Sequence, residues 1–305
     1  MGARPVKVRP VDCVPQDDIK ENILENLNLI KEWEGPCKVH LKTAWIMSAG
    51  PSLEFATKQM FTKEYFEKLP RDSYEIFCIK HSLPVLRDAG IVPFACVALD
   101  PRPVDGTSTH GFVRTDLYDA APRETLMFIA SMTHPSVTKR LIDRGYRVIG
   151  WHAAADAIDQ LINDGKMKPA LSHAGGTCSA MRCLSMSRQM GFRKANLIGF
   201  DASLANPPEN PDEKHISTGN DGNEKEKNKY IEVYNPKDKD HYEFWSTGEL
   251  IAMAQDIENS LKNQHLMDME LRFYATDKGR SYGGNVVETT PNNTLFPTYQ
   301  ERYEQ

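Results

Sequence analysis

The chain has 305 residues, of which 40% are hydrophobic and 26% charged, and a formal net charge of -5, a balance typical of a soluble globular protein of one large domain or two small ones. No apolar run approaches the ~20 residues of a membrane-spanning helix, and the amino terminus lacks the apolar core of a signal peptide, so we expect a cytoplasmic protein. The six cysteines show no metal-binding spacing, which predicts free buried thiols, and the mild acidity argues against extensive binding to a nucleic-acid backbone.

The first segments of the chain differ in pattern. Residues 1–16 are rich in proline and lack periodicity, which indicates an extended arm. Apolar residues then recur at helical spacing from Ile19 to Ile30. We therefore expect an amphipathic helix that ends near the Gly35-Pro36 pair and packs on its own domain.

Short, nearly continuous apolar runs follow, and most are separated by segments long enough for a helix. Runs of this kind are typical of strands buried on both faces of a parallel sheet. They span residues 43–47, 75–79, 94–99, 125–130, 146–151 and 195–200. The alternation predicts an α/β fold, a doubly wound, mostly parallel sheet with helices on both faces.

The second half of the chain adds a helix, a polar segment and a last strand. A helix is predicted over 179–190, ended by Gly191, and a strand over 271–275. Residues 206–241 are dominated by polar and charged residues and indicate an insertion, either a passive loop or a lid that orders on a ligand. The capping-box pattern at 246–249 predicts a second late helix.

In a doubly wound sheet the ligand binds beyond the carboxyl ends of the strands, so the residues that directly follow the apolar runs carry the functional information. Two such places combine small residues with a predicted helix start, where backbone N–H groups can hold an anion. They are Ser48, Gly50, Pro51 and Ser52 after the first run, and Gly175, Gly176 and Thr177 before the helix at 179. Such turns also occur without any ligand.

Polar side chains follow three of the other runs. Asp100 and Arg102 can together hold a metal ion, a ribose hydroxyl or a phosphate, although an aspartate there can also simply cap a turn. His134 can donate to a phosphate or act as acid or base, or be a structural histidine. Asp201 ends the last run. Taken with the two small-residue loops, these positions predict a nucleotide-like ligand.

The order of these motifs resembles the 6-hydroxymethylpterin pyrophosphokinase-like (MptE-like) family, which also includes the motility accessory factors, similar to glycosyltransferases. The resemblance covers about residues 40–285 and is nearest to the phage and bacterial single-domain branch. The motifs that carry it are Ile46-Met-Ser-Ala-Gly-Pro-Ser-Leu53, Leu86-Arg-Asp-Ala-Gly-Ile-Val-Pro93, Leu99-Asp-Pro101, Thr133-His-Pro135, Gly175-Gly-Thr177, Met190-Gly-Phe192, Leu197-Ile-Gly-Phe-Asp201, His215, Trp245-Ser-Thr-Gly and Thr276-Asp-Lys-Gly279.

The resemblance implies a Rossmann-like domain over 40–285 with the polar insertion 206–241, preceded by an arm and helix (1–39) and followed by a tail (286–305). It also implies that a nucleotide lies between the two small-residue loops. Archaeal pyrophosphokinases of the family carry a second carboxylate beside the strand-end aspartate, whereas this chain has Asp100-Pro-Arg102. Asp100 is therefore the candidate metal ligand, and Mg²⁺ is an open expectation.

Three functions follow. The first is a transferase, a glycosyltransferase above all, that takes a group from a nucleotide or nucleotide-sugar donor, with Asp100, His134, Asp201 and His215 as candidate catalytic residues. The second is a Mg²⁺- and ATP-dependent pyrophosphokinase acting on 6-hydroxymethyl-dihydropterin or a similar hydroxymethyl compound. The third is a non-catalytic nucleotide-binding module. The acceptor (glycan, protein or modified nucleobase) and the oligomeric state are not legible in the sequence.

Overall fold

The computed structural model describes residues 14–104, 113–175, 178–202, 230–234, 243–247, 250, 252–254, 256, 268–276 and 286–289. The helices are α1 (Gln16–Leu29), α2 (Ser52–Gln59), α3 (Lys63–Lys68), α4 (Leu83–Asp88), α5 (Asp116–Asp119), α6 (Pro135–Asp143), α7 (Asp156–Asn163) and α8 (Ser179–Gln189). The strands are β1 (Glu32–Trp33), β2 (Thr43–Met47), β3 (Tyr74–Ile79), β4 (Ala95–Ala98), β5 (Leu126–Ala130), β6 (Val148–Ala153), β7 (Ser172–His173), β8 (Lys194–Ile198), β9 (Tyr230–Tyr234), β10 (Glu243–Thr247), β11 (Glu270–Thr276) and β12 (Val286–Thr289).

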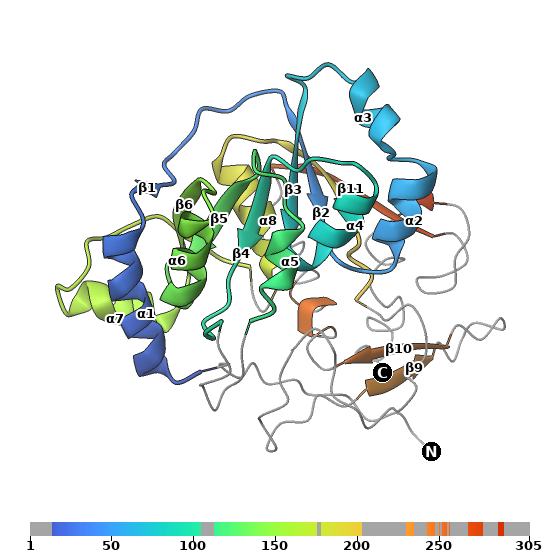
Figure 1. The fold of residues 1–305 in the computed structure, drawn as a ribbon. Helices are drawn as coiled ribbons and strands as arrows, with labels where there is room; N and C mark the ends of the chain where they lie inside the picture. Colours follow the sequence, from blue (N-terminus) through green and yellow to red (C-terminus); the bar gives the residue numbers. More distant parts are fainter. Residues whose placement is uncertain are drawn as a thin grey trace.

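The main sheet has the strand order β1-β6-β5-β4-β3-β2-β8-β11-β12, and β7 pairs with β6 (Figure 1). Every described pairing in it is parallel except that of β11 with β12. The chain runs outward from β2 to β6 on one side, then crosses back to place β8 on the other side of β2. The order of the strands therefore reverses between β2 and β8, the position where ligands bind in doubly wound folds.

Both faces of the sheet are covered by helices. Along β2, Ala44 and Ile46 pack into one hydrophobic cluster with α1, α7 and α8, whereas Trp45 and Met47 pack into the other with the helices α2 to α6. The strand positions of both clusters are almost fully buried. This two-sided burial explains why the strands appear in the sequence as continuous apolar runs, and it confirms the predicted doubly wound α/β architecture.

The first helix packs on its own domain, as expected from its apolar spacing, but it ends at Leu29 rather than near Gly35, and strand β1 lies between the two. Ile19 and Ile23 of α1 are 2% and 0% exposed and belong to the first hydrophobic cluster, and the helix contacts α6 and α7. The boundaries at residues 39 and 285 stay predictions. The sheet itself extends past both of them, since β1 and β12 belong to it.

Two expectations need correction. Ser246 does not begin a helix: it lies in β10, which pairs with β9, and its Oγ donates to the Ala202 carbonyl at 2.9 Å. The predicted late helix is nevertheless present, since residues 250, 252–254 and 256 are helical, and Ser246 lies in the strand that precedes it. Among the thiols, Cys78, Cys96 and Cys183 are free and buried, but Cys37 is exposed and Cys178 is half-buried.

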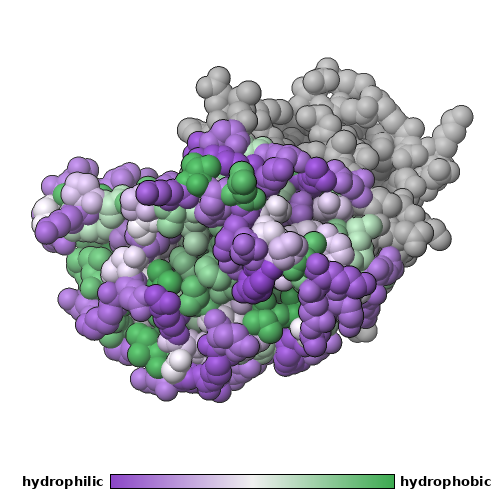
Figure 2. Space-filling model, turned by 90° about the horizontal axis from the view of Figure 1, so that it is seen from above, coloured by the Kyte–Doolittle hydropathy of each residue, from purple (hydrophilic) through white to green (hydrophobic). Residues whose placement is uncertain are grey.

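Some expectations lie outside the described residues or concern the surface. Of the predicted polar insertion, only β9 is described, and the choice between lid and passive loop stays open. No helix within the described ranges has both the length and the apolar character needed to cross a membrane. Viewed from above, the described surface is mainly hydrophilic, with smaller hydrophobic groups between the polar residues (Figure 2).

Candidate functional site

The loop after β2 is tied to the end of β8 at the point where the strand order reverses. The Ser48 amide donates to the Ile198 carbonyl and the Gly50 amide to the Gly199 carbonyl, each at 2.8 Å. A Cβ atom at Gly50 would lie 2.5 Å from the Gly199 oxygen and would also overlap the carboxylate of Asp201. Only glycine therefore allows β2 and its loop to approach β8 this closely.

Asp201 interacts with the start of α2. Its Oδ2 accepts hydrogen bonds from both the amide and the hydroxyl of Ser52, each at 2.8 Å, and the Ser52 hydroxyl also accepts from the Gly199 amide at 3.1 Å. Pro51 is the residue before this first helical turn. A carboxylate of the protein thus lies at the helix start where the sequence predicts the anion of a ligand.

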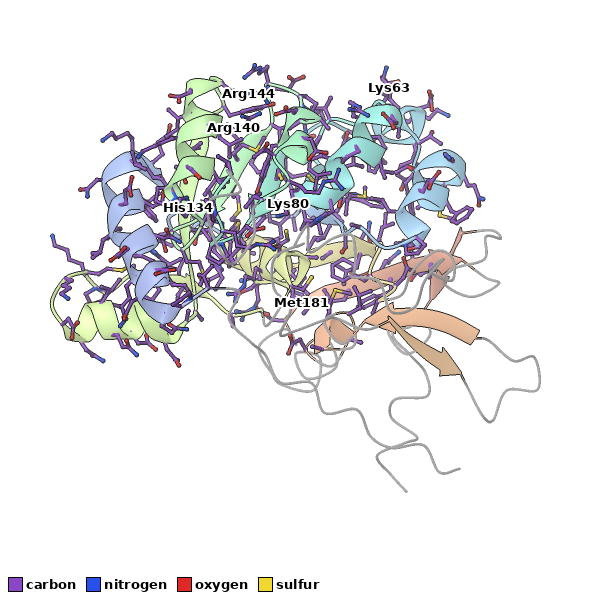
Figure 3. The ribbon with its side chains drawn as sticks, turned by 60° about the horizontal axis from the view of Figure 1, so that its bottom comes forward. Lys63, Lys80, His134, Arg140, Arg144 and Met181 are labelled. Atoms are coloured by element: carbon purple, nitrogen blue, oxygen red, sulfur yellow. The ribbon has the colours of Figure 1, made fainter. Side chains whose placement is uncertain are left out.

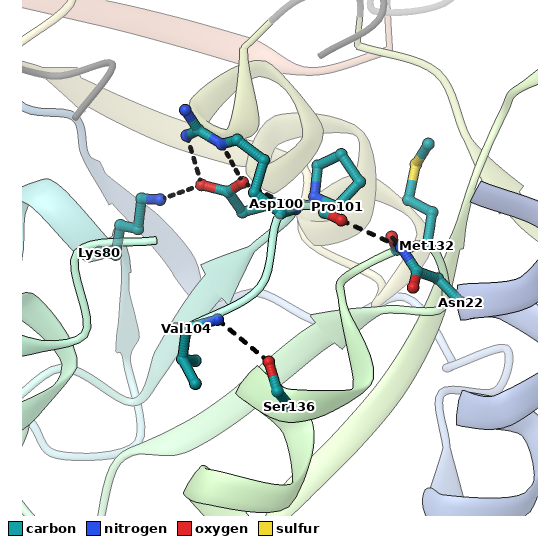
Figure 4. Close-up of polar contacts among 8 residues, drawn as sticks. Asn22, Lys80, Asp100, Pro101, Val104, Met132 and Ser136 are labelled. Atoms are coloured by element: carbon teal, nitrogen blue, oxygen red, sulfur yellow. Dashed lines mark hydrogen bonds and ion pairs between the residues drawn. The ribbon is translucent and has the colours of Figure 1, made fainter. Parts of the chain in front are cut away.

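The polar centre of the carboxyl edge is an ion cluster of Lys80, Asp100 and Arg102 (Figure 4). Lys80 Nζ lies 2.5 Å from Asp100 Oδ2. Arg102 binds both oxygens of the same carboxylate, Nε to Oδ1 at 2.7 Å and Nη2 to Oδ2 at 2.8 Å. The three residues are 9%, 4% and 8% exposed, so the charges lie largely out of water. Charged groups this deeply buried are stable only when paired.

The electrostatics of this cluster keep Asp100 ionised. Burial raises the pKa of its carboxyl group, but the charge of Lys80 and the hydrogen bonds and charge of Arg102 outweigh burial and lower the pKa to about 2. A Mg²⁺ ion at this carboxylate would meet two positive charges that already use its oxygens, so Asp100 does not fit the metal-ligand role. Nor do the described residues contain a group of three or more His, Cys, Asp and Glu side chains able to hold a metal.

His134 follows β5 and caps the start of α6. Its Nδ1 accepts from the Ser136 amide at 3.2 Å and lies 2.8 Å from the Ser136 hydroxyl, whose oxygen accepts from the Val104 amide at 3.1 Å. Because Nδ1 accepts, we assign the hydrogen of the neutral ring to Nε2, which makes that atom a donor. The His134 amide also donates to the Asp100 carbonyl at 3.0 Å. Figure 3 shows Lys80 and the half-buried His134 toward the middle of the view and Lys63 at its upper edge.

A second group of polar side chains lies at the ends of β1, β6 and β7. His152 stacks on Trp33 with ring centroids 4.6 Å apart, and its Nδ1 lies 2.9 Å from the Ser131 hydroxyl. Burial and the neighbouring His173 lower its pKa to about 4. His173 is itself fully buried and pairs through Nε2 with Glu34. These residues join the edge strand β1 to the rest of the sheet.

The glycine-rich turn before α8 is only partly described. A Cβ atom at Gly175 would lie 2.6 Å from Cγ and 2.8 Å from the backbone nitrogen of Arg182, so glycine is needed for packing against α8. Gly176, Thr177 and His215 lie outside the described residues. The structure therefore brings Asp100 and Arg102 into one cluster, connects His134 to it, and places Asp201 in a separate contact with Ser52.

Sequence reasoning missed Lys80 and two asparagines of α1. Lys80 directly follows the predicted strand at 75–79, so the strand-end rule could have found it. Asn22 and Asn26 lie four residues apart on α1 and bind the loops after β4 and β5. Their signal is weak, since it consists of two polar residues on an otherwise apolar helix face.

Comparison with known proteins places the fold in a family. A family model described as 6-hydroxymethylpterin diphosphokinase MptE-like matches residues 18–207. The chain belongs to the MptE-like family. The match begins inside α1 and ends after Asp201, so it covers all the described site residues.

The MptE-like chain is also similar to a solved structure, "Structure of MAf glycosyltransferase from Magnetospirillum magneticum AMB-1". The TM-score is 0.53 at 13% sequence identity, and the match covers 88% of this chain and 37% of the other. At this identity the similarity shows the fold alone, and this chain spans little more than a third of the neighbour's length. No curated protein matches the sequence.

Proposed function

We propose that this protein is a transferase that takes a group, most readily a glycosyl group, from a nucleotide-activated donor. The observation that carries the proposal is the buried cluster of Lys80, Asp100 and Arg102 at the carboxyl edge of a parallel sheet. The family and the structural neighbour are both named after group-transfer enzymes, a diphosphokinase and a glycosyltransferase. They support the class of reaction, while the donor and the group transferred belong to the proposal.

The charges of the cluster suit a phosphate. Two cations and one carboxylate leave one net positive charge among these three residues. Arg102 offers planar N–H donors that match phosphate oxygens, and Lys80 supplies a second cation. Asp100 holds both cations in place before a ligand arrives, so little reorganisation is needed when negative charge develops on a leaving phosphate. His134, whose amide donates to the Asp100 carbonyl, is the third residue proposed to contact the phosphate.

Transfer breaks the bond between the donor carbon and its phosphate oxygen and forms a bond from that carbon to an acceptor hydroxyl, whose proton goes to a base. Asp100 is a poor base because its pKa is about 2. His134 uses Nδ1 to cap α6, and Asp201 binds Ser52. In this proposal the proton goes to His215, a candidate acid or base from the sequence.

Isothermal titration with CMP, UDP and ATP, with and without Mg²⁺, tests the proposal. At least one nucleotide should bind, and Arg102→Met should weaken it by at least about tenfold because a charge-assisted hydrogen bond is lost. The matched control is Arg87→Met, since Arg87 is exposed and pairs only with the adjacent Asp88 in the described contacts. If none of the three nucleotides binds, the proposal is refuted.

The family description favours one alternative, a pyrophosphokinase acting on a hydroxymethylpterin or a similar hydroxymethyl compound. This reaction consumes ATP and releases AMP, which is measured directly by chromatography. Because both oxygens of Asp100 bind cations, its metal ion would have to bind elsewhere. If ATP is consumed in the presence of the pterin without formation of AMP, the pyrophosphokinase hypothesis is excluded and the glycosyl-transfer proposal is unaffected.

A further inference from the structure

The helix that precedes the sheet reaches into the candidate site through two buried asparagines. Asn22 and Asn26 lie four residues apart, on one face of α1, and are 6% and 0% exposed. Asn22 Nδ2 donates to the carbonyls of Pro101 at 3.1 Å and Met132 at 3.4 Å (Figure 4). One asparagine thus binds both the loop after β4 and the loop after β5.

Asn26 binds the second loop more tightly. Its Nδ2 donates to the carbonyls of Ser131 at 2.8 Å and Thr133 at 2.6 Å. Beyond the strand ends the sheet supplies no further backbone donors, so these buried carbonyls take side-chain donors instead. The Oδ1 atom of Asn26 is buried and accepts no hydrogen bond from the described residues. A leucine would avoid the cost of burying that atom, so packing alone does not explain an asparagine here.

The four acceptors lie next to the candidate site residues. Pro101 separates Asp100 from Arg102, and Thr133 directly precedes His134. The two loops are also joined to each other, because the His134 amide donates to the Asp100 carbonyl. The side-chain amides of α1 therefore hold the backbone that carries the anion-binding groups.

We propose that Asn22 and Asn26 are positioning residues, which set the loops of Asp100, Arg102 and His134 in the geometry that binds an anionic ligand. This inference rests on the proposed function for the identity of the ligand. Helix α1 is then part of the site, although the sequence predicts it as a segment that precedes the domain.

The experiment compares Asn22→Leu, Asn26→Leu and the double variant with Asn28→Leu, an exposed position whose amide donates only to Leu24 within the same helix among the described contacts. Leucine keeps the approximate volume and removes the donors. Amide hydrogen exchange at Arg102, Val104, His134 and Ser136 should rise by at least about tenfold in the double variant. The dissociation constant of the tightest-binding nucleotide should rise about as much, measured at a temperature where the double variant is still folded, since the lost hydrogen bonds also lower its melting temperature.

Two results overturn the proposal: unchanged exchange at these amides in a folded double variant, or faster exchange with unchanged nucleotide affinity. If the double variant does not fold, the single variants decide by the same measurements. If the wild type binds none of the three nucleotides, the proposed function fails. The positioning role of the two asparagines is then tested without a ligand, by measuring the pKa of the Asp100 carboxyl group with ¹³C NMR. That pKa should rise above about 2 in the double variant; an unchanged value overturns the inference.

Discussion

Replacing Lys80 by methionine tests the ion cluster on which the proposed function depends. Methionine keeps the length and most of the apolar stem of lysine but removes the charge that lies 2.5 Å from Asp100 Oδ2. Arg102 remains bound to both carboxylate oxygens. The variant therefore leaves a buried carboxylate with one cation instead of two.

The expected loss follows from the pKa of Asp100. Burial is the largest influence on this group and opposes ionisation, so without Lys80 the pKa should rise from about 2 toward the ordinary value of 3.8. A shift of this size corresponds to about 2 kcal/mol of folding free energy at neutral pH. Removal of one partner from a buried ion pair costs about 3–5 kcal/mol in other proteins. Since Arg102 persists, we expect a loss of about 2–3 kcal/mol.

Guanidinium chloride unfolding measures the free energy, and ¹³C NMR measures the titration of Asp100. The control is Lys63→Met, because the side chain of Lys63 is 54% exposed and pairs with Glu67 at 3.4 Å. Such a surface pair is worth at most about 1 kcal/mol. If Lys80→Met leaves both the pKa of Asp100 and the unfolding free energy unchanged, charge pairing does not stabilise this carboxylate and the reasoning is refuted.

Three further outcomes are expected. Gly50→Ala should lose about 3 kcal/mol of unfolding free energy, measured in urea, because its Cβ would overlap backbone atoms. The control Gly35→Ala, whose Cβ would meet no atom within 4 Å, should leave the stability nearly unchanged. Equal losses in the two variants would contradict the close approach of β2 and β8. Asp201→Ala should cost about 1–2 kcal/mol, measured in the same way, since the start of α2 loses its acceptor; no loss would refute the capping role. Stability should fall as the pH drops from 6.5 to about 4, because the unfolded chain protonates His152 in this window and the folded one does not. The decline should shrink in His152→Gln, and an identical profile would refute this assignment.

The sequence predicts the central strands well because both faces of the sheet are buried. Each strand from β2 to β6 then carries a nearly continuous apolar run, interrupted by few polar residues such as Glu75 and His152, which a single sequence reveals. The two-residue strands β1 and β7 carry no such run: they read Glu-Trp and Ser-His. They are held by contacts across the chain, among them the pair of His173 with Glu34, which is 139 residues distant. Local periodicity holds no information about such pairs.

The strand-end rule could predict Asp100, Arg102 and His134 as candidates because parallel strands bring their carboxyl ends to one edge. It could not predict how they interact. Lys80 would ordinarily extend into water, but here it is buried beside Asp100, which lies in the loop after the neighbouring strand β4. The acceptors of Asn22 lie 79 and 110 residues further along the chain. Distances of this kind come from the topology of the sheet rather than from any local pattern.

The loop at Gly50 illustrates what a local motif leaves undecided. A small-residue turn before a helix exposes N–H groups that bind either a ligand anion or a carboxylate of the protein, and the two look identical in the sequence. The deciding residue is Asp201, which lies 149 positions beyond Ser52. Its Oδ2 atom accepts hydrogen bonds from both the amide and the hydroxyl of Ser52. Because a second anion beside Asp201 would be repelled, a phosphate is better placed at Lys80 and Arg102, where the carboxylate is already outnumbered. The glycine then serves mainly to bring β2 against β8, and the proposed function places the charge of the ligand at the loops after β3 and β4.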